Sequence, residues 1–399
     1  MQTFDINDFL EHYWQQKPVV LRGFFSQFND PIDEHDLAGL AQEEDIDSRI
    51  ISNNSGNWHV TQGPITNFED ACKGKWTLLV QGVDRYIQDV ASILTPFSFI
   101  PNWRLDDLMV SFANKGAGVG AHIDQYDVFL VQGKGKRRWR VGSPGNYKEV
   151  FPHPSLRQIE AFVPIIDEVL LPGDVLYIPP GWPHDGKALE DCMTYSVGFR
   201  APEALQLAES LAMMLECSVN NTRFSDPKRP SCDTPANVTL DDIQALKKQL
   251  IQTIESQEFT QALMASISEQ GIPEFPVEPP FSVEEVANEI AAGASTRPAP
   301  GIKPLIIMQS DESQVNALYV NGEQFLFNDE DKLSYVALGD GTLLNAVSLP
   351  DSPSFAFYET LTTLINNGYW EYIFNIYTLI YNKNNSSFIR AYFRLYSYT

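Results

Sequence analysis

The chain has little cysteine and no long apolar run. Its four cysteines, Cys72, Cys192, Cys217 and Cys232, show no CxxC spacing. The sequence therefore indicates neither a zinc knuckle nor a disulfide framework, and the thiols are expected to be reduced. Nowhere do about eighteen apolar residues follow one another, which argues against a membrane-spanning helix. The first residues have neither the basic start nor the apolar stretch of a signal peptide, so we expect a cytoplasmic protein.

Basic residues are also scarce. The chain has 28 Lys and Arg against 52 Asp and Glu, which gives a formal net charge of -24. Such a charge repels phosphate backbones, so no direct nucleic-acid binding is expected, and it favours basic partners. The simpler alternative is that an acidic surface only keeps the protein in solution. The basic cluster over residues 134–140 offers little support for a nucleic-acid patch, because alternation along a strand places its charges on opposite faces.

The pattern of apolar residues divides the chain into three regions. Between about 76 and 199, short runs rich in Val, Ile, Leu, Phe and Tyr are separated by Gly and Pro turns, which is typical of a β-sandwich or barrel. After Pro202 apolar residues recur at spacings of three and four as far as Ile267, which predicts amphipathic helices. We expect a mainly β domain over residues 1–202, a helical domain over 203–272 and a small domain over 273–399.

The small last domain is expected to be α+β. Ser282 and Glu285 form a capping box that predicts a helix through Ala292. The dipeptide Asn321-Gly322 between two apolar runs predicts a hairpin with a type I′ turn. These elements resemble a winged-helix module. From about residue 371 onward the composition changes, with no Asp, a single Glu and many Tyr, Asn and Phe residues, and no function is assigned to that stretch.

The helical region also predicts an oligomer. The helices over residues 204–267 expose more apolar face than a small barrel is expected to cover, and such surface is typical of an interface between copies. Met213 and Met214 fit this interpretation, because methionines at helical spacing more often pack in a core or a dimer contact than act in catalysis. We therefore expect a homodimer formed through the helical domain.

Two motifs carry candidate chemistry. The run GAGVGAHID ends in His122 and Asp124, and residues two apart in a strand point to one face, so both can reach one point. The run GDVLYIPPGWPH, over residues 173–184, delivers His184 after a turn and two stiffening prolines. Two histidines and one carboxylate on one face of a metal are the ligands of non-haem iron(II) oxygenases. Zinc sites use the same ligand types, so the triad alone does not settle the metal.

These motifs resemble the two cupin motifs, and Asp124 in place of the second histidine is similar to the 2-oxoglutarate-dependent JmjC oxygenases. Among these, the chain resembles the bacterial ribosomal-protein oxygenases that hydroxylate an arginine of a large-subunit ribosomal protein. The resemblance is strongest over residues 7 to about 200. It implies a double-stranded β-helix of the cupin/JmjC type, followed by a helical dimerisation domain and a winged-helix-like domain. It also implies iron(II) held by His122, Asp124 and His184, with 2-oxoglutarate and dioxygen as co-substrates.

The strand KRRWR, over residues 136–140, gives an independent indication. Arg137 and Trp139 share one face by period two, while Arg138 lies on the other. If Trp139 faces the core, Arg137 does too, and a buried arginine needs an anionic partner such as a dicarboxylate. In the family that the chain resembles, a basic residue at the position of Arg137 binds the far carboxylate of 2-oxoglutarate. Ser111 matches a family position that helps to hold the same ligand.

Three functions stay open from the sequence. The leading hypothesis is hydroxylation of an arginine side chain of a ribosomal protein, for which an acidic rim would suit the basic target. The alternatives are an oxygenase that acts on a histidine or a small molecule, and a cupin that holds metal without oxygenation. Arg137 beside a complete triad favours an oxygenase. The other histidines, His12, His35, His59 and His153, are expected to be packed or surface residues.

Overall fold

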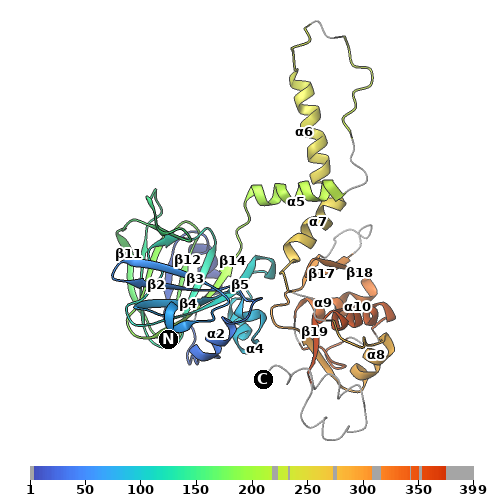
Figure 1. Cartoon of the computed structure of the whole chain (residues 1–399). Coiled ribbons are helices and arrows are strands. Elements are labelled where there is room, and N and C mark those ends of the chain that lie inside the picture. Colours follow the sequence, from blue (N-terminus) through green and yellow to red (C-terminus); the bar gives the residue numbers. More distant parts are fainter. Residues whose placement is uncertain are drawn as a thin grey trace. The chain divides into compact units, whose positions relative to one another are not determined.

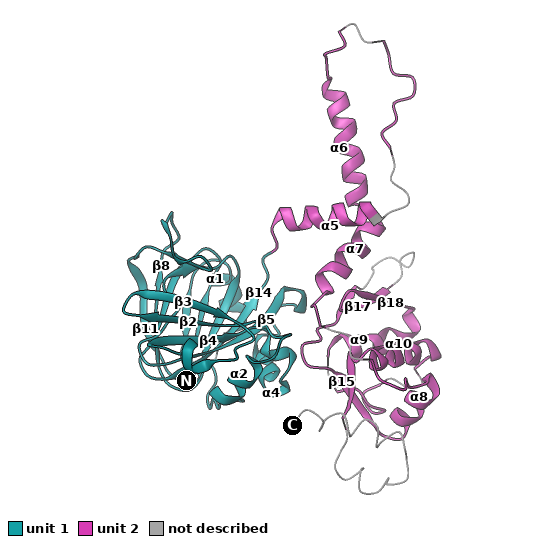
Figure 2. Ribbon diagram, viewed as in Figure 1, with its two compact units in different colours: residues 1–201 teal, residues 202–399 magenta. Residues whose placement is uncertain are grey.

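The computed structural model describes residues 4–217, 223–231, 234–272, 276–307, 316–341, 343–349 and 353–373. Across these ranges no helix is both long and apolar enough to cross a membrane. The chain divides into two compact units, residues 1–201 and 202–399, shown in teal and magenta in Figure 2. The division into three domains stays a prediction, and most of the unusual stretch after residue 371 lies outside the described residues.

Two antiparallel sheets form the first unit (Figure 1). The larger sheet has the strand order β1-β12-β7-β14-β5-β4-β2-β3, and the smaller sheet has the order β11-β8-β13-β6. The strands of the larger sheet are β1 (Val19–Leu21), β2 (Ser48–Asn54), β3 (Asn57–Gln62), β4 (Lys75–Val80), β5 (Leu105–Ala113), β7 (Asp127–Gln132), β12 (Val175–Ile178) and β14 (Cys192–Phe199). Those of the smaller sheet are β6 (His122–Ile123), β8 (Arg137–Gly142), β11 (Pro164–Leu170) and β13 (Pro183–Ala188). A separate hairpin consists of β9 (Glu149–His153) and β10 (Leu156–Ile159).

Alternation along the strands of the larger sheet separates two apolar environments. Its outer face packs against N-terminal helices, including α1 (Ile6–His12), whose Phe9 ring lies 5.5 Å from Phe129 and 5.0 Å from Tyr177 between centroids. Its inner face packs against the smaller sheet, and Leu130 of β7 shares a cluster with Trp139 of β8. The mainly β cupin-type fold predicted from the sequence is therefore confirmed.

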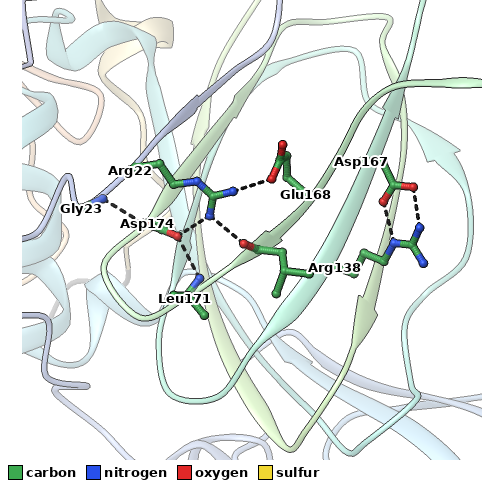
Figure 3. A network of polar contacts seen from close by, with 8 residues as sticks. Arg22, Gly23, Arg138, Asp167, Glu168, Leu171 and Asp174 are labelled. Atoms are coloured by element: carbon green, nitrogen blue, oxygen red, sulfur yellow. Dashed lines mark hydrogen bonds and ion pairs between the residues drawn. The ribbon is translucent and has the colours of Figure 1, made fainter. Parts of the chain in front are cut away.

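A network of polar contacts ties the chain after β1 to both sheets (Figure 3). Arg22 donates to the carboxylate of Asp174 and to the carbonyl of Val169, each at 2.6 Å, and to the carboxylate of Glu168 at 2.7 Å. Asp174 also accepts the backbone N–H of Gly23 at 2.8 Å. Val169 and Glu168 lie in β11, whereas Asp174 directly precedes β12. The network therefore fixes the turn from which the chain continues toward β13.

Three helices follow the barrel, in the region where the apolar periodicity predicts amphipathic helices. They are α5 (Ala204–Cys217), α6 (Leu240–Ile254) and α7 (Gln257–Ser268). A break separates α6 from α7 because the Ser256 hydroxyl caps α7 by accepting the backbone N–H of Phe259 at 3.1 Å. Along α6, which is described over its whole length, no residue is buried. Helix α6 therefore presents its leucine and isoleucine side chains to solvent.

A small α+β fold with its own apolar core follows. It comprises α8 (Val283–Ala291), β15 (Ser295–Pro298), β16 (Leu305–Ile307), β17 (Asn316–Val320), β18 (Glu323–Phe327), α9 (Lys332–Gly339), α10 (Phe355–Asn366) and β19 (Trp370–Ile373). Ser282 and Glu285 form the expected capping box at the start of α8. Asn321 and Gly322 join β17 to β18 with φ angles of 47° and 89°. Both angles are positive, as a type I′ turn requires, so this hairpin is confirmed.

Candidate metal centre and co-substrate pocket

His122, Asp124 and His184 meet on the smaller sheet. Each offers a ligand atom, and these atoms lie within 4.8 Å of one another. The Asp124 Oδ2 atom is 3.8 Å from His122 Nε2 and 3.5 Å from His184 Nε2. His122 and His184 are direct partners across β6 and β13, which brings together two motifs that are distant in sequence. The three side chains can therefore hold one metal ion and leave positions open on its other side.

Backbone carbonyl groups orient both imidazole rings. His122 Nδ1 lies 2.9 Å from the carbonyl oxygen of Gly120, and His184 Nδ1 lies 3.0 Å from that of Trp182. A carbonyl oxygen can only accept, so Nδ1 is the protonated nitrogen in each ring. The unprotonated Nε2 atoms consequently face Asp124, which is the arrangement that a metal ion requires of neutral histidine ligands.

The electrostatics of the group suit a divalent cation. Burial opposes the charge of Asp124, but the two imidazoles outweigh it and hold the pKa of the carboxyl well below its usual range. Burial and the neighbouring His184 lower the pKa of His122. Burial also acts to lower the pKa of His184, but the hydrogen bond and charge of Asp124 outweigh it and raise that pKa. A divalent cation between these groups would offset the charge of Asp124 and bind both histidines in their neutral form.

Tyr126 is a partner of Asp124 that the sequence analysis does not identify. Its hydroxyl group forms a hydrogen bond with the Asp124 carboxylate. Burial of the hydroxyl, Asp124 and Asp107 all raise the pKa of Tyr126, so the phenol stays protonated and donates. The two-residue spacing between Asp124 and Tyr126 is a signal that could have revealed this contact.

Arg137 lies further along the same sheet. It is four residues from Val141, the β8 residue that pairs with His184, which corresponds to about 13 Å of strand. Arg137 is only 5% exposed, and its Nε and Nη2 atoms are buried without a hydrogen-bond partner among the described residues. Its guanidinium carbon is 5.6 Å from the centroid of the Trp139 ring. A buried cation of this kind suits an anionic ligand.

A row of polar side chains crosses the inner face of the larger sheet. Ser111 on β5 pairs with Thr194 on β14, and Thr194 pairs in turn with Gln132 on β7. All three are buried. The hydroxyl of Thr194 and Oε1 of Gln132 have no hydrogen-bond partner within the described part of the chain. We call these three residues the polar row. Only Ser111 is predicted from the sequence, because the other two are revealed by strand register alone.

Neighbouring contacts place the polar row beside Arg137. Ala188 pairs with Arg137 across β13 and β8. It also packs against Ala113 and Cys192 of the larger sheet. Those two residues lie two positions from the polar row on β5 and β14, and so on the same face. The polar row and Arg137 are thus on facing walls of one polar region inside an otherwise apolar barrel.

Two facing sheets, a His-Asp-His group and an inward arginine define a class of protein. The residues fit a resident metal and a dicarboxylate, because the ligand set suits a divalent cation and the buried guanidinium suits an anion. The chain is a 2-oxoglutarate-dependent oxygenase of the cupin/JmjC class.

Comparison with known proteins agrees with this assignment. The JmjC domain family matches residues 92–207, and the ROXA-like winged helix family matches residues 247–371. The ribosomal protein uL16 3-hydroxylase of Escherichia coli (strain K12) is 40% identical over 375 residues, which cover 92% of this chain and 98% of that protein. The chain belongs to the family of JmjC-type ribosomal oxygenases.

Solved structures extend the likeness to the whole fold. The X-ray structure of E. coli ycfD matches with a TM-score of 0.86 at 38% identity, covering 94% of this chain and 99% of that one. The E. coli ribosomal oxygenase YcfD in complex with cobalt and 2-oxoglutarate matches with a TM-score of 0.83 at 38% identity, covering 93% and 98%. The winged-helix assignment of the last domain is thereby confirmed.

Proposed function

We propose that this protein is an iron(II)- and 2-oxoglutarate-dependent hydroxylase of an arginine side chain on a large-subunit ribosomal protein. The observation that carries the proposal is Arg137, a buried cation with two nitrogen atoms that have no hydrogen-bond partner among the described residues, in the same barrel as a complete His-Asp-His group. A cupin that only stored metal would have no use for such a cation. The activity named for the E. coli relative, 3-hydroxylation of ribosomal protein uL16, supports a ribosomal substrate.

In this proposal His122, Asp124 and His184 are the iron(II) ligands. Cobalt in the solved complex of YcfD supports a divalent metal in this family, and two imidazoles with one carboxylate favour iron(II) for oxygenase chemistry. The chemistry supplied when iron(II) is bound is oxidative: dioxygen converts 2-oxoglutarate to succinate and carbon dioxide, and a substrate carbon gains a hydroxyl group. The chain itself contributes ligands, their orientation and a shielded cavity.

Arg137 and Ser111 are the proposed partners of the far carboxylate of 2-oxoglutarate. The roughly 13 Å of strand between Arg137 and the residue paired with His184 can be bridged by a five-carbon diacid and a long arginine side chain together. The planar guanidinium can hold that carboxylate through two parallel hydrogen bonds. Trp139 and Leu130 line the inner apolar cluster nearby and limit the access of water.

Negative charge near the metal ligands supports a cationic substrate side chain. Besides burial, the charges of Asp124 and Asp107 raise the pKa of Tyr126, so two carboxylates act on this part of the site. The chain as a whole carries a formal charge of -24. A guanidinium group is attracted by both, whereas a neutral histidine or small molecule gains little from them. Arginine is therefore the substrate residue that we propose.

The proposal includes a homodimer in the cytoplasm, where ribosomal proteins are found. On α6 the side chains of Leu240, Leu246 and Leu250 are exposed. An apolar helix face of this kind is typical of an interface between copies. Pairing of two copies through the helical region would remove this surface from water.

The test uses the purified protein with iron(II), ascorbate, 2-oxoglutarate and the isolated substrate protein. We expect succinate release and a gain of one oxygen atom, placed on an arginine by fragmentation mass spectrometry. An oxygen on a histidine would contradict the arginine assignment. Absence of succinate with the wild-type protein would contradict the oxygenase itself.

A further inference from the structure

The carbonyl group that orients His122 belongs to Gly120, in the glycine-rich loop over residues 116–121. Gly120 has a φ of 87°, in the left-handed region where a side chain is disfavoured. Its carbonyl oxygen accepts from His122 Nδ1 at 2.9 Å. The direction of this one peptide group therefore sets the tautomer and the ring orientation of His122.

Strand β10 holds the carbonyl groups on both sides of Gly120. The side-chain amide of Gln158 donates from Nε2 to the carbonyl oxygen of Val119 at 2.7 Å. The backbone N–H of Ile159 donates to the carbonyl oxygen of Ala121 at 2.8 Å. Three consecutive carbonyl groups are thus oriented together, the outer two by β10 and the middle one toward His122.

The fit between Gly120 and Gln158 is close. A Cβ atom on Gly120 would lie 2.1 Å from Gln158 Nε2, so the glycine leaves the room that the amide occupies. Val119 and Leu156 share one apolar cluster, which adds packing to the hydrogen bonds. Contacts of this kind hold the loop in one conformation, although its glycines alone would leave it flexible.

The opposite side of the loop rests on β13. The backbone N–H of Ala188 donates to the carbonyl oxygen of Ala117 at 2.8 Å. A Cβ atom on Gly118 would lie 2.2 Å from the carbonyl oxygen of Gly186, so the loop backbone packs directly against the backbone of β13 at this point. The loop is therefore held between β13, which carries His184, and β10, which carries Gln158.

We propose that Gln158 is a positioning residue of the metal centre. Its amide fixes the Val119 carbonyl, and through the adjoining Gly120 peptide it fixes the direction of His122. Gln158 touches neither metal nor substrate, and the inference rests on the proposed role of His122, Asp124 and His184 as ligands. Loss of a partner that orients a ligand weakens metal binding about 10- to 100-fold. Because Gln158 acts on His122 through the intervening Gly120 peptide, we expect a loss of metal affinity at the lower end of this range, about tenfold.

The experiment compares three variants of the full chain. Gln158→Met keeps the length of the side chain but cannot donate, and Gln158→Glu carries an ionised carboxylate that cannot donate either. Arg157→Ala is the matched control, because the neighbouring Arg157 is exposed and ion-paired to Glu149. Cobalt(II) is titrated into metal-free protein, and its visible absorption reports affinity and coordination geometry. Thermal unfolding of the metal-free proteins and the apparent affinity for 2-oxoglutarate at saturating cobalt are measured in parallel.

We expect both Gln158 variants to bind cobalt(II) about tenfold more weakly, with an altered absorption spectrum. The control should match the wild type, and affinity for 2-oxoglutarate at saturating cobalt should change little in every variant. If Gln158→Met fails to fold, Gln158→Glu decides the question alone. Wild-type affinity and spectrum in a folded Gln158 variant would overturn the inference, and so would an equal loss in the control. A wild-type protein that shows no cobalt spectrum would overturn the proposed metal centre instead.

Discussion

Replacing Arg137 with alanine tests the co-substrate pocket most directly. The guanidinium is buried, and two of its nitrogen atoms lack a hydrogen-bond partner among the described residues. The ligand-free protein therefore gains little from this cation, and its melting temperature should change little in Arg137→Ala. Binding of 2-oxoglutarate should suffer, because the far carboxylate of the ligand must leave water and then finds no positive partner.

The size of the effect follows from the burial of Arg137. Breaking a buried ion pair by removing one partner costs about 3 to 5 kcal/mol. Because about 1.4 kcal/mol corresponds to a factor of ten, KM for 2-oxoglutarate should rise by at least about a hundredfold. Metal affinity should stay unchanged, since Arg137 lies about 13 Å along the strand from the residue paired with His184.

Arg138→Ala is the matched control on the opposite face of β8. Arg138 is exposed and holds Asp167 through two contacts, Nε to Oδ1 at 2.6 Å and Nη2 to Oδ2 at 2.5 Å (Figure 3). An exposed ion pair contributes about 0 to 1 kcal/mol to stability, so this variant should keep its KM for 2-oxoglutarate. Succinate release against 2-oxoglutarate concentration measures both variants. A raised KM in Arg138→Ala together with an unchanged KM in Arg137→Ala would refute the assignment of Arg137 to the co-substrate pocket. An unchanged KM in both variants would refute 2-oxoglutarate as the co-substrate.

Asp124→Ala should abolish succinate release while circular dichroism stays native, because one ligand and its charge are lost; undiminished turnover would contradict the triad. Thr194→Val should raise KM for 2-oxoglutarate about fivefold, the equivalent of one hydrogen bond of about 1 kcal/mol, and an unchanged KM would remove the polar row from the pocket. Leu250→Glu should give a monomer by light scattering, whereas a monomeric wild type would rule out the dimer. Added salt should slow hydroxylation of the basic substrate protein more than it slows 2-oxoglutarate turnover without that protein, because the Debye screening length falls to about 8 Å near physiological ionic strength. Equal responses of the two rates would contradict a role of the acidic surface in substrate recognition.

Local sequence patterns were sufficient for much of the fold and for placing the His122 and Asp124 side chains together. His122 and Asp124 are two residues apart, and alternation along β8 buries Arg137 and exposes Arg138 as the sequence predicts. The capping box at Ser282 could also be predicted, since it depends on residues within one helical turn. Such features need no knowledge of which strands lie side by side.

Some features that depend on the register of distant strands could not be predicted from local patterns. Thr194 and Gln132 could not be connected with Ser111 from the sequence, because their proximity follows only from the register of three strands. Gln158 was missed for the same reason, since its partner in the glycine-rich loop lies on a separate element. The Ser256 cap between α6 and α7 was a local signal, but continuous apolar periodicity across it concealed the break.

The pairing of β1 has a consequence for the synthesis of this protein. Val19 pairs with Tyr177, so the first strand of the larger sheet can form its native pairing only after Tyr177 has been synthesised, 158 residues later. At about 5 to 20 residues per second, that interval is roughly 8 to 30 s. During this time Val19–Leu21 is an apolar strand with both edges unpaired, a state prone to association with other chains. Slow translation or a shortage of chaperones should therefore reduce the yield of native enzyme before any step of catalysis is affected.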